Sequence, residues 1–179
     1  MRRRFAFAAL VLISASPIYV LPAFAIDMPA RKPGLWEVKM DFEGRKIPAQ
    51  VMKQCTDATS DKVMNSNFGG SAQPACSKQD VTKSATGMVV DSICKFGDST
   101  TTSHAVVTGS FDSAYTVDVT STREGGRATP GMPATGGTHM TIQAKWLGPC
   151  AAGQKPGDII MANGMTMNVL DISSPARRP

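Results

Sequence analysis

Residues 34–44 read GLWEVKMDFEG and contain the clearest strand pattern of the sequence. The apolar side chains of Trp36, Val38, Met40 and Phe42 alternate there with charged ones. Because successive side chains of a strand point to opposite faces, this alternation predicts a strand with one buried and one solvated face. The segment therefore sets the fold class, a sheet with one face turned to a core.

The segments that follow continue the pattern. After a turn at residues 44–46, a return strand is predicted over residues 47–53, with Ile47, Ala49 and Val51 on one face. Residues 56–67 carry capping residues and an apolar pair that predict one short helix.

Strand patterns then fill most of the remaining chain. Two strand-like runs between residues 78 and 96 flank a turn at 84–87, and further strands are predicted over 100–108, 115–122 and 139–147. A Gly- and Pro-rich loop is predicted over 124–137, and a hairpin over 159–170 centred on Asn163-Gly164. The sum is an all-β antiparallel meander, a strongly curved sheet or a partly closed barrel with one short helix.

The N-terminal residues have the pattern of a cleaved secretory signal peptide. Three arginines at residues 2–4 precede an apolar run over 5–21, and Ala23-Phe24-Ala25 supplies a small-x-small cleavage site. Ser and Pro residues interrupt the run and leave it too short for a membrane span, so no membrane anchor is expected in the mature form. The expected location is the periplasm.

This cleavage site divides the chain into three parts. Residues 1–25 are the predicted signal peptide, 26–150 a disulfide-bonded β domain, and 151–179 a C-terminal hairpin and tail. The charge changes with cleavage: 19 Lys and Arg face 14 Asp and Glu in the whole chain, and removal of three arginines leaves 16 − 14 = +2. The remaining basic residues are scattered singly, so no nucleic-acid partner is expected.

The four cysteines predict two disulfides. An even number of cysteines in an exported chain favours disulfide bridges. The sequence contains no Cys-x-x-Cys pair, and this absence argues against a redox site or a zinc site. A hairpin turn between Ala85 and Thr86 brings Cys76 within one position of Cys94, close enough for a bridge with a small bulge. Cys55 and Cys150 are then left to pair, which would close the sheet toward a barrel.

The order of these features resembles a known family. The Pro-Gly-Leu-Trp-Glu-Val opening at 33–38 is followed by Cys55-Thr56 before a helix, a hairpin from Cys76 to Cys94, a Gly-Ser-Phe-x-x-x-Tyr strand at 109–115, and Gly148-x-Cys150. This arrangement is similar to family 3617 of the domains of unknown function, whose members are exported proteins found mainly in Gram-negative bacteria. The resemblance implies location and fold, and no activity.

The sequence offers little support for enzyme chemistry. His104 lies in a strand where a satisfied surface histidine is expected, and His139 follows a flexible loop that is a poor platform for catalysis. No phosphate-binding loop or zinc motif is found. We therefore expect a non-enzymatic protein without a cofactor.

Binding is the remaining class of function. A curved sheet whose concave face carries aromatic and Met side chains can enclose a small apolar ligand, and the predicted ligand face consists of Trp36, Met40, Phe42, Tyr115 and Trp146. The alternative is an envelope interaction or stress module that acts by protein contacts through an open sheet edge.

Methionines suggest a third hypothesis. Met161, Met165 and Met167 cluster in sequence, and thioether sulfurs suit cuprous copper. A two-residue hairpin at Asn163-Gly164 would pair Ile160 with Met167 and leave Met161 on the opposite face. That geometry argues against a metal site, and no metal ligands are assigned from the sequence.

Overall fold

The computed structural model describes residues 29–44, 47–66, 75–128 and 135–173, so the predicted signal peptide lies outside the described residues. The described residues form nine strands and two short helices. In chain order these are β1 Gly34–Phe42, β2 Gln50–Thr56, α1 Ala58–Ser66, β3 Ala75–Ser84, β4 Gly87–Phe96, β5 Ser99–Ser110, β6 Ala114–Gly125, β7 Gly136–Gly148, β8 Asp158–Met161, β9 Thr166–Asn168 and α2 Val169–Ser173.

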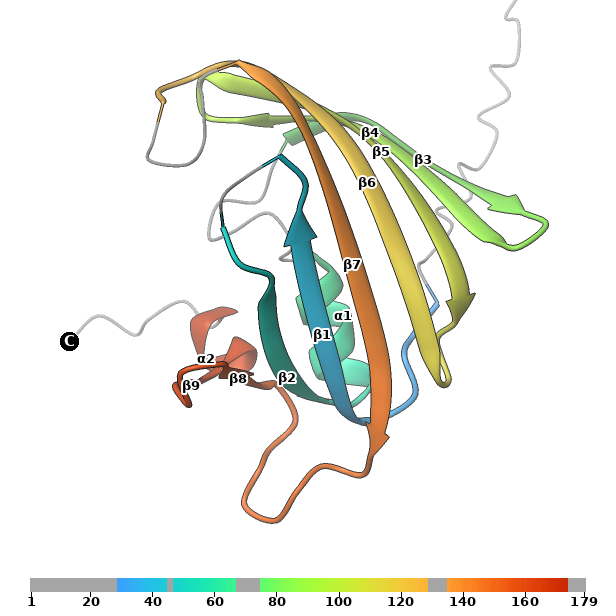
Figure 1. Ribbon diagram of the computed structural model, residues 1–179, viewed down its shortest axis with the longest axis vertical. Coiled ribbons are helices and arrows are strands. Elements are labelled where there is room, and N and C mark those ends of the chain that lie inside the picture. The colour runs from blue at the N-terminus through green and yellow to red at the C-terminus, as the bar shows by residue number, and fades with distance from the viewer. Residues whose placement is uncertain (1–28, 45–46, 67–74, 129–134, 174–179) are drawn as a thin grey trace, which may run out of the picture.

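All nine strands belong to one antiparallel sheet in the order β3-β4-β5-β6-β7-β1-β2-β8-β9. The predicted all-β meander is confirmed over β3 to β7, and β1 joins this meander through β7. The sheet curls strongly but does not close, because β3 and β9 stand at opposite ends of the order. In Figure 1 it bends away from the viewer around α1, which lies behind β1 and β7.

The residue pairing places the apolar positions of the first strand on the concave face. Val38 pairs with Ala144 and Met40 with Ile142, and the core cluster consists of Trp36, Val38, Ile142 and Ala144. The alternation in residues 34–44 therefore has the predicted explanation. One set of side chains fills the core, and the other faces solvent.

The second strand begins later than its sequence indicates. Ile47 lies before β2, and both Ile47 and Val51 are exposed. The side chains of β2 that lie on the concave face are those of Met52 and Gln54, which pair with Val38 and Trp36. The register follows from β1, since the residue opposite a buried position must share its face.

Both disulfides join the partners predicted from the sequence, Cys55 to Cys150 and Cys76 to Cys94. The β3–β4 register shifts between Cys76 and Lys78, and this irregularity brings Cys76 opposite Cys94. The long-range bridge does not close the sheet toward a barrel as expected. It links β2 to the segment directly after β7. Because β2 and β7 flank β1, the bridge reinforces the middle of the sheet.

The C-terminal hairpin differs from its predicted register by one residue. Ile159 pairs with Met167 and Ile160 with Thr166, and Met161 N donates to Met165 O at 2.9 Å. The loop therefore contains residues 162–164, with Gly164 at φ +83°, where glycine is favoured. A loop with one more residue reverses which side chains share a face, so the predicted pair of Ile160 with Met167 is wrong.

Candidate functional site

The five residues of the predicted ligand face lie on one face of the sheet. Trp36 pairs with Trp146, Met40 with Ile142, Phe42 with Met140, and Tyr115 with Ala144, so all five share the concave side. Trp36 is fully buried, whereas the other four are partly exposed. Trp36 therefore belongs to the core, and the other four border accessible space.

Trp36 is the centre of an aromatic group. Its ring lies 5.7 Å from the Tyr115 ring, which stacks on Phe111 at 4.7 Å. The guanidinium carbon of Arg31 lies 5.8 Å from the Trp36 ring centroid, and Trp36 Nε1 donates to Lys32 O at 2.8 Å. These contacts fasten the segment before β1 onto the concave face.

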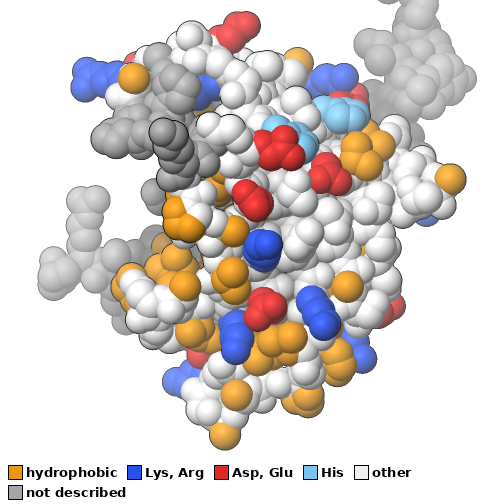
Figure 2. All heavy atoms as spheres, viewed as in Figure 1, with side chains coloured by type: hydrophobic (Ala, Val, Ile, Leu, Met, Phe, Trp, Pro, Cys, Tyr) orange, Lys and Arg blue, Asp and Glu red, His pale blue; other side chains and the backbone are white. Residues whose placement is uncertain are grey.

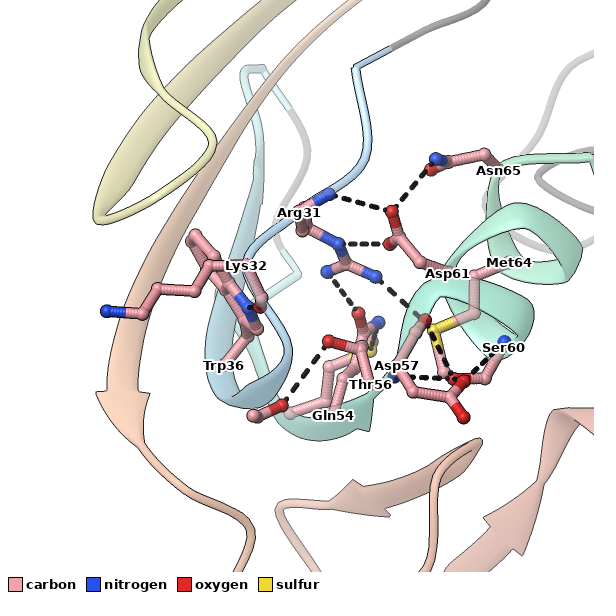
Figure 3. Close-up of polar contacts among 12 residues, drawn as sticks. Arg31, Lys32, Trp36, Gln54, Thr56, Asp57, Ser60, Asp61, Met64 and Asn65 are labelled. Carbon is pink, nitrogen blue, oxygen red and sulfur yellow. Dashed lines mark hydrogen bonds and ion pairs between the residues drawn. The ribbon is translucent and has the colours of Figure 1, made fainter.

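A buried ion pair joins this segment to helix α1 (Figure 3). Arg31 Nε donates to Asp61 Oδ1 at 2.6 Å, Arg31 N donates to Asp61 Oδ2 at 2.9 Å, and the two side chains are 5% and 1% exposed. Arg31 Nη1 donates to Gln54 Oε1 at 2.7 Å, and Nη2 donates to Met64 Sδ at 3.4 Å. A buried charge needs such partners, because isolation from water without them is costly.

The start of helix α1 is fixed by a reciprocal cap. Ser60 N donates to Asp57 Oδ1 at 2.8 Å, and Asp57 N donates to Ser60 Oγ at 2.9 Å. The hydrogen bonds that Ser60 donates to the Asp57 carboxylate, from its backbone N–H and from its hydroxyl, lower the pKa of Asp57 below its usual value. A helix of nine residues is marginal in isolation, so the cap and the Arg31–Asp61 pair hold it in place.

Tyr115 lies beside this polar group. Burial raises the pKa of its hydroxyl above 10.0, and the positive charge of Arg31 opposes that rise in part. The phenol is therefore a neutral hydrogen-bonding group at physiological pH. Tyr115 thus lies between the aromatic group around Trp36 and the buried Arg31–Asp61 pair.

Beyond α1 the concave face continues as rows that run across the strands. One row is apolar and partly exposed throughout, and consists of Val90, Ala105, Val119, Met140 and Phe42. The next row toward the upper end of β4 to β7 carries hydroxyl groups, and consists of Ser92, Ser103, Ser121 and Thr138. The face thus changes from apolar to polar along the strands.

The convex face carries charged side chains together with apolar ones such as Val89 and Val106. Figure 2 shows acidic, basic and histidine side chains scattered over it. His104 Nδ1 lies 2.7 Å from Asp91 Oδ1, and His139 Nδ1 lies 2.9 Å from Glu43 Oε2. A shallow groove of about 370 Å³ there is lined in part by Glu37, Lys39 and Lys145, and its walls are mostly flat sheet surface.

Two properties of the described residues bear on other kinds of site. Their helices include none that is long and apolar enough to cross a membrane. Among the same residues, no group of three or more His, Cys, Asp or Glu side chains is placed to hold a metal ion.

Sequence reasoning did not find Arg31, Gln54 and Asp61. Arg31 and Asp61 are 30 residues apart and lie in segments whose local pattern indicates solvent exposure. The one available signal was Met64, three residues after Asp61 and so on a neighbouring side of the helix. It indicates which side of α1 is buried, but not that an arginine meets it.

The comparisons agree with the resemblance seen in the sequence. A family model described as "Protein of unknown function (DUF3617)" matches residues 31–150, from the buried Arg31 to the disulfide-bonded Cys150. No curated protein and no solved structure matches the chain. The family match covers more than half of the chain, so this protein belongs to the DUF3617 family of proteins of unknown function.

Proposed function

We propose that this protein is exported to the periplasm and binds a small apolar ligand on the concave face of its sheet, without enzymatic activity. The observation that carries the proposal is the row of partly exposed apolar side chains from Val90 to Phe42. Apolar groups that remain accessible in a concave surface favour binding, because a ligand can remove them from water.

The arrangement of the face supports a ligand with a polar end. The row of hydroxyl groups lies directly beside the apolar row, one position further along the same face of each strand. A molecule with an apolar body and a polar group would satisfy both rows at once. Helix α1 packs on β2 and α2, at one side of this surface.

Export is supported by two features of the chain. The first is the basic, then apolar, then small-x-small pattern of residues 1–25. The second is the pair of disulfides, which form and persist in oxidising compartments.

The alternative, a module that binds an envelope protein through a sheet edge, has less support. Edge strand β3 carries an irregularity between Cys76 and Lys78, and it presents Lys78 and Lys83. Bulges and lysines at an edge hinder the addition of another strand. A partner that adds to β3 would have to overcome both.

Two matched double variants test ligand binding on the concave face. Val117→Thr with Val119→Thr makes the concave face more polar at nearly constant volume, while Val89→Thr with Val106→Thr makes the same change on the convex face. The probe is the fluorescent fatty acid cis-parinaric acid, titrated into each folded protein. We expect the concave double variant to bind it at least tenfold more weakly, which is about 1.4 kcal/mol, and the convex one to bind like the wild type.

Circular dichroism and urea unfolding serve as controls that both double variants remain folded. Equal affinity in the two variants would place the bound probe elsewhere and would contradict the proposal. Failure of the wild type to bind the probe at all would also contradict it.

A further inference from the structure

The C-terminal hairpin places three methionines on one face. Met161 N donates to Met165 O at 2.9 Å, and Met167 pairs with Ile159, two residues before Met161. Because alternate residues share a face, Met161, Met165 and Met167 lie on the same side of the hairpin. The observed register thus removes the argument that separated Met161 from the other two.

Backbone contacts fix this arrangement. Met165 N donates to Asn163 Oδ1 at 3.0 Å, and Gly164 N donates to Met161 O at 2.9 Å. In such a hairpin, directly opposed residues have Cβ atoms about 4.5–5.5 Å apart and diagonal neighbours about 7–8 Å apart. Methionine has three rotatable side-chain bonds, so three sulfurs at these positions can meet at one point.

Exposure separates two of these methionines, Met165 and Met167, from those that fill the core, while Met161 is partly exposed. Met165 is 54% exposed and Met167 is 36% exposed, whereas Met64 and Met88 are 6% and 8% exposed. Filling gaps in the core explains Met64 and Met88, but it does not explain thioethers that face solvent. Met52 on β2 pairs directly with Met161 and places a fourth thioether beside the group.

We propose that Met161, Met165 and Met167 form a surface site for cuprous copper. Thioether sulfur is a soft ligand that selects Cu(I) over hard cations such as Mg²⁺ and Ca²⁺. The site lies on the same side of the sheet as the concave face, since Met161 pairs with Met52, but on β8 and β9, and it shares no residue with the apolar row proposed to bind a ligand. It also lies in the residues that follow the family match. Neutral thioethers release no proton on binding, so the affinity should change little between pH 5 and pH 8.

The test is an anaerobic titration of the folded protein with Cu(I) in competition with bicinchoninate, a coloured Cu(I) chelator. We expect the wild type to withdraw one Cu(I) per chain from the chelator. Met165→Leu with Met167→Leu should bind Cu(I) at least 100-fold more weakly, because two of three ligands are lost while volume and polarity are nearly kept. The matched control, Met64→Leu with Met88→Leu, changes two buried methionines outside the hairpin and outside the apolar row, and it should bind Cu(I) like the wild type.

X-ray absorption at the copper edge provides a second measurement that does not depend on the variants. It should show sulfur as the nearest neighbour of the metal. Equal affinity in the hairpin variant and the control would overturn the proposal, as would a spectrum without sulfur neighbours or the failure of the wild type to compete with the chelator. Neither result would alter the proposal for the concave face, which uses other residues and another probe.

Discussion

Arg31 and Asp61 are charged residues whose side chains are buried, and each one compensates the charge of the other. Their side chains are 5% and 1% exposed, and the pair joins the segment before β1 to helix α1. In such a pair the loss of one partner leaves the other charge buried and uncompensated. The pair therefore determines where α1 lies, more than it adds net stability.

We predict that Asp61→Leu and Arg31→Met each lower the free energy of unfolding by about 3–5 kcal/mol. The double variant should lose clearly less than the sum of the two, because it leaves no unpaired charge. Urea unfolding of the four proteins measures this coupling. Additive losses would show that the two side chains act independently.

Gly34 is required where β1 approaches the end of β7. Its φ is +133°, and a Cβ atom there would lie 2.6 Å from Trp146 Nε1 and would overlap the carbonyl oxygen of Gly148. Gly148 has almost the same φ, +136°, but open space around its would-be Cβ. The two glycines thus differ in crowding and not in backbone conformation.

Gly34→Ala should therefore be less stable than Gly148→Ala by about 1–3 kcal/mol, the usual cost of overpacking. Thermal or urea unfolding of both variants gives the difference directly. Equal losses would mean that the surroundings of Gly34 relax without cost.

Helix α1 depends on the cap at Asp57. Asp57→Ala should lower the free energy of unfolding by about 1 kcal/mol at pH 7, because an orphan N–H group of the helix loses its acceptor. Asp57→Asn is the control, since it keeps an acceptor oxygen but carries no charge.

The contribution of the Asp57 charge should depend on pH. The pKa of Asp57 is lower in the folded protein than its ordinary value of 3.8, so the stabilisation is complete above that value and is lost as the pH falls through the folded pKa. The stability difference between wild type and Asp57→Asn should thus shrink as the pH falls below about 4. A difference that stays constant down to pH 2 would contradict this account.

The two disulfides should contribute unequally to the free energy of unfolding. They close chain segments with separations of 95 and 18 residues. In the chain-entropy account these correspond to about 4.7 and about 3 kcal/mol. Replacement of Cys55 and Cys150 by Ala should therefore lower stability more than replacement of Cys76 and Cys94, as measured by urea unfolding. The reverse order would show that the loop-closure term does not dominate.

The antiparallel all-β meander was predictable from periodicity, whereas the choice between an open curled sheet and a partly closed barrel was not. The alternation in residues 34–44 predicted the buried face, and the turn between Ala85 and Thr86 predicted the partner of Cys76. Both predictions rest on strand geometry, which fixes where a side chain points once the register is known.

Two features of the molecule could not be predicted in this way. The Arg31–Asp61 pair joins segments 30 residues apart, and no local pattern marks either residue as buried. The face of the Met161 side chain depended on a single residue in the loop, because a two-residue and a three-residue hairpin differ by one position of register. Small changes in turn geometry thus decide which side chains meet.

Native mass spectrometry of protein released from the periplasm tests directly whether this protein is exported and carries a small apolar ligand. We expect a chain that begins at Ile26, contains two disulfides, and carries a small apolar adduct that is lost on denaturation. Cis-parinaric acid added to the same sample should displace that adduct. A native mass equal to the bare chain, both before and after addition of the fatty acid, would contradict the account.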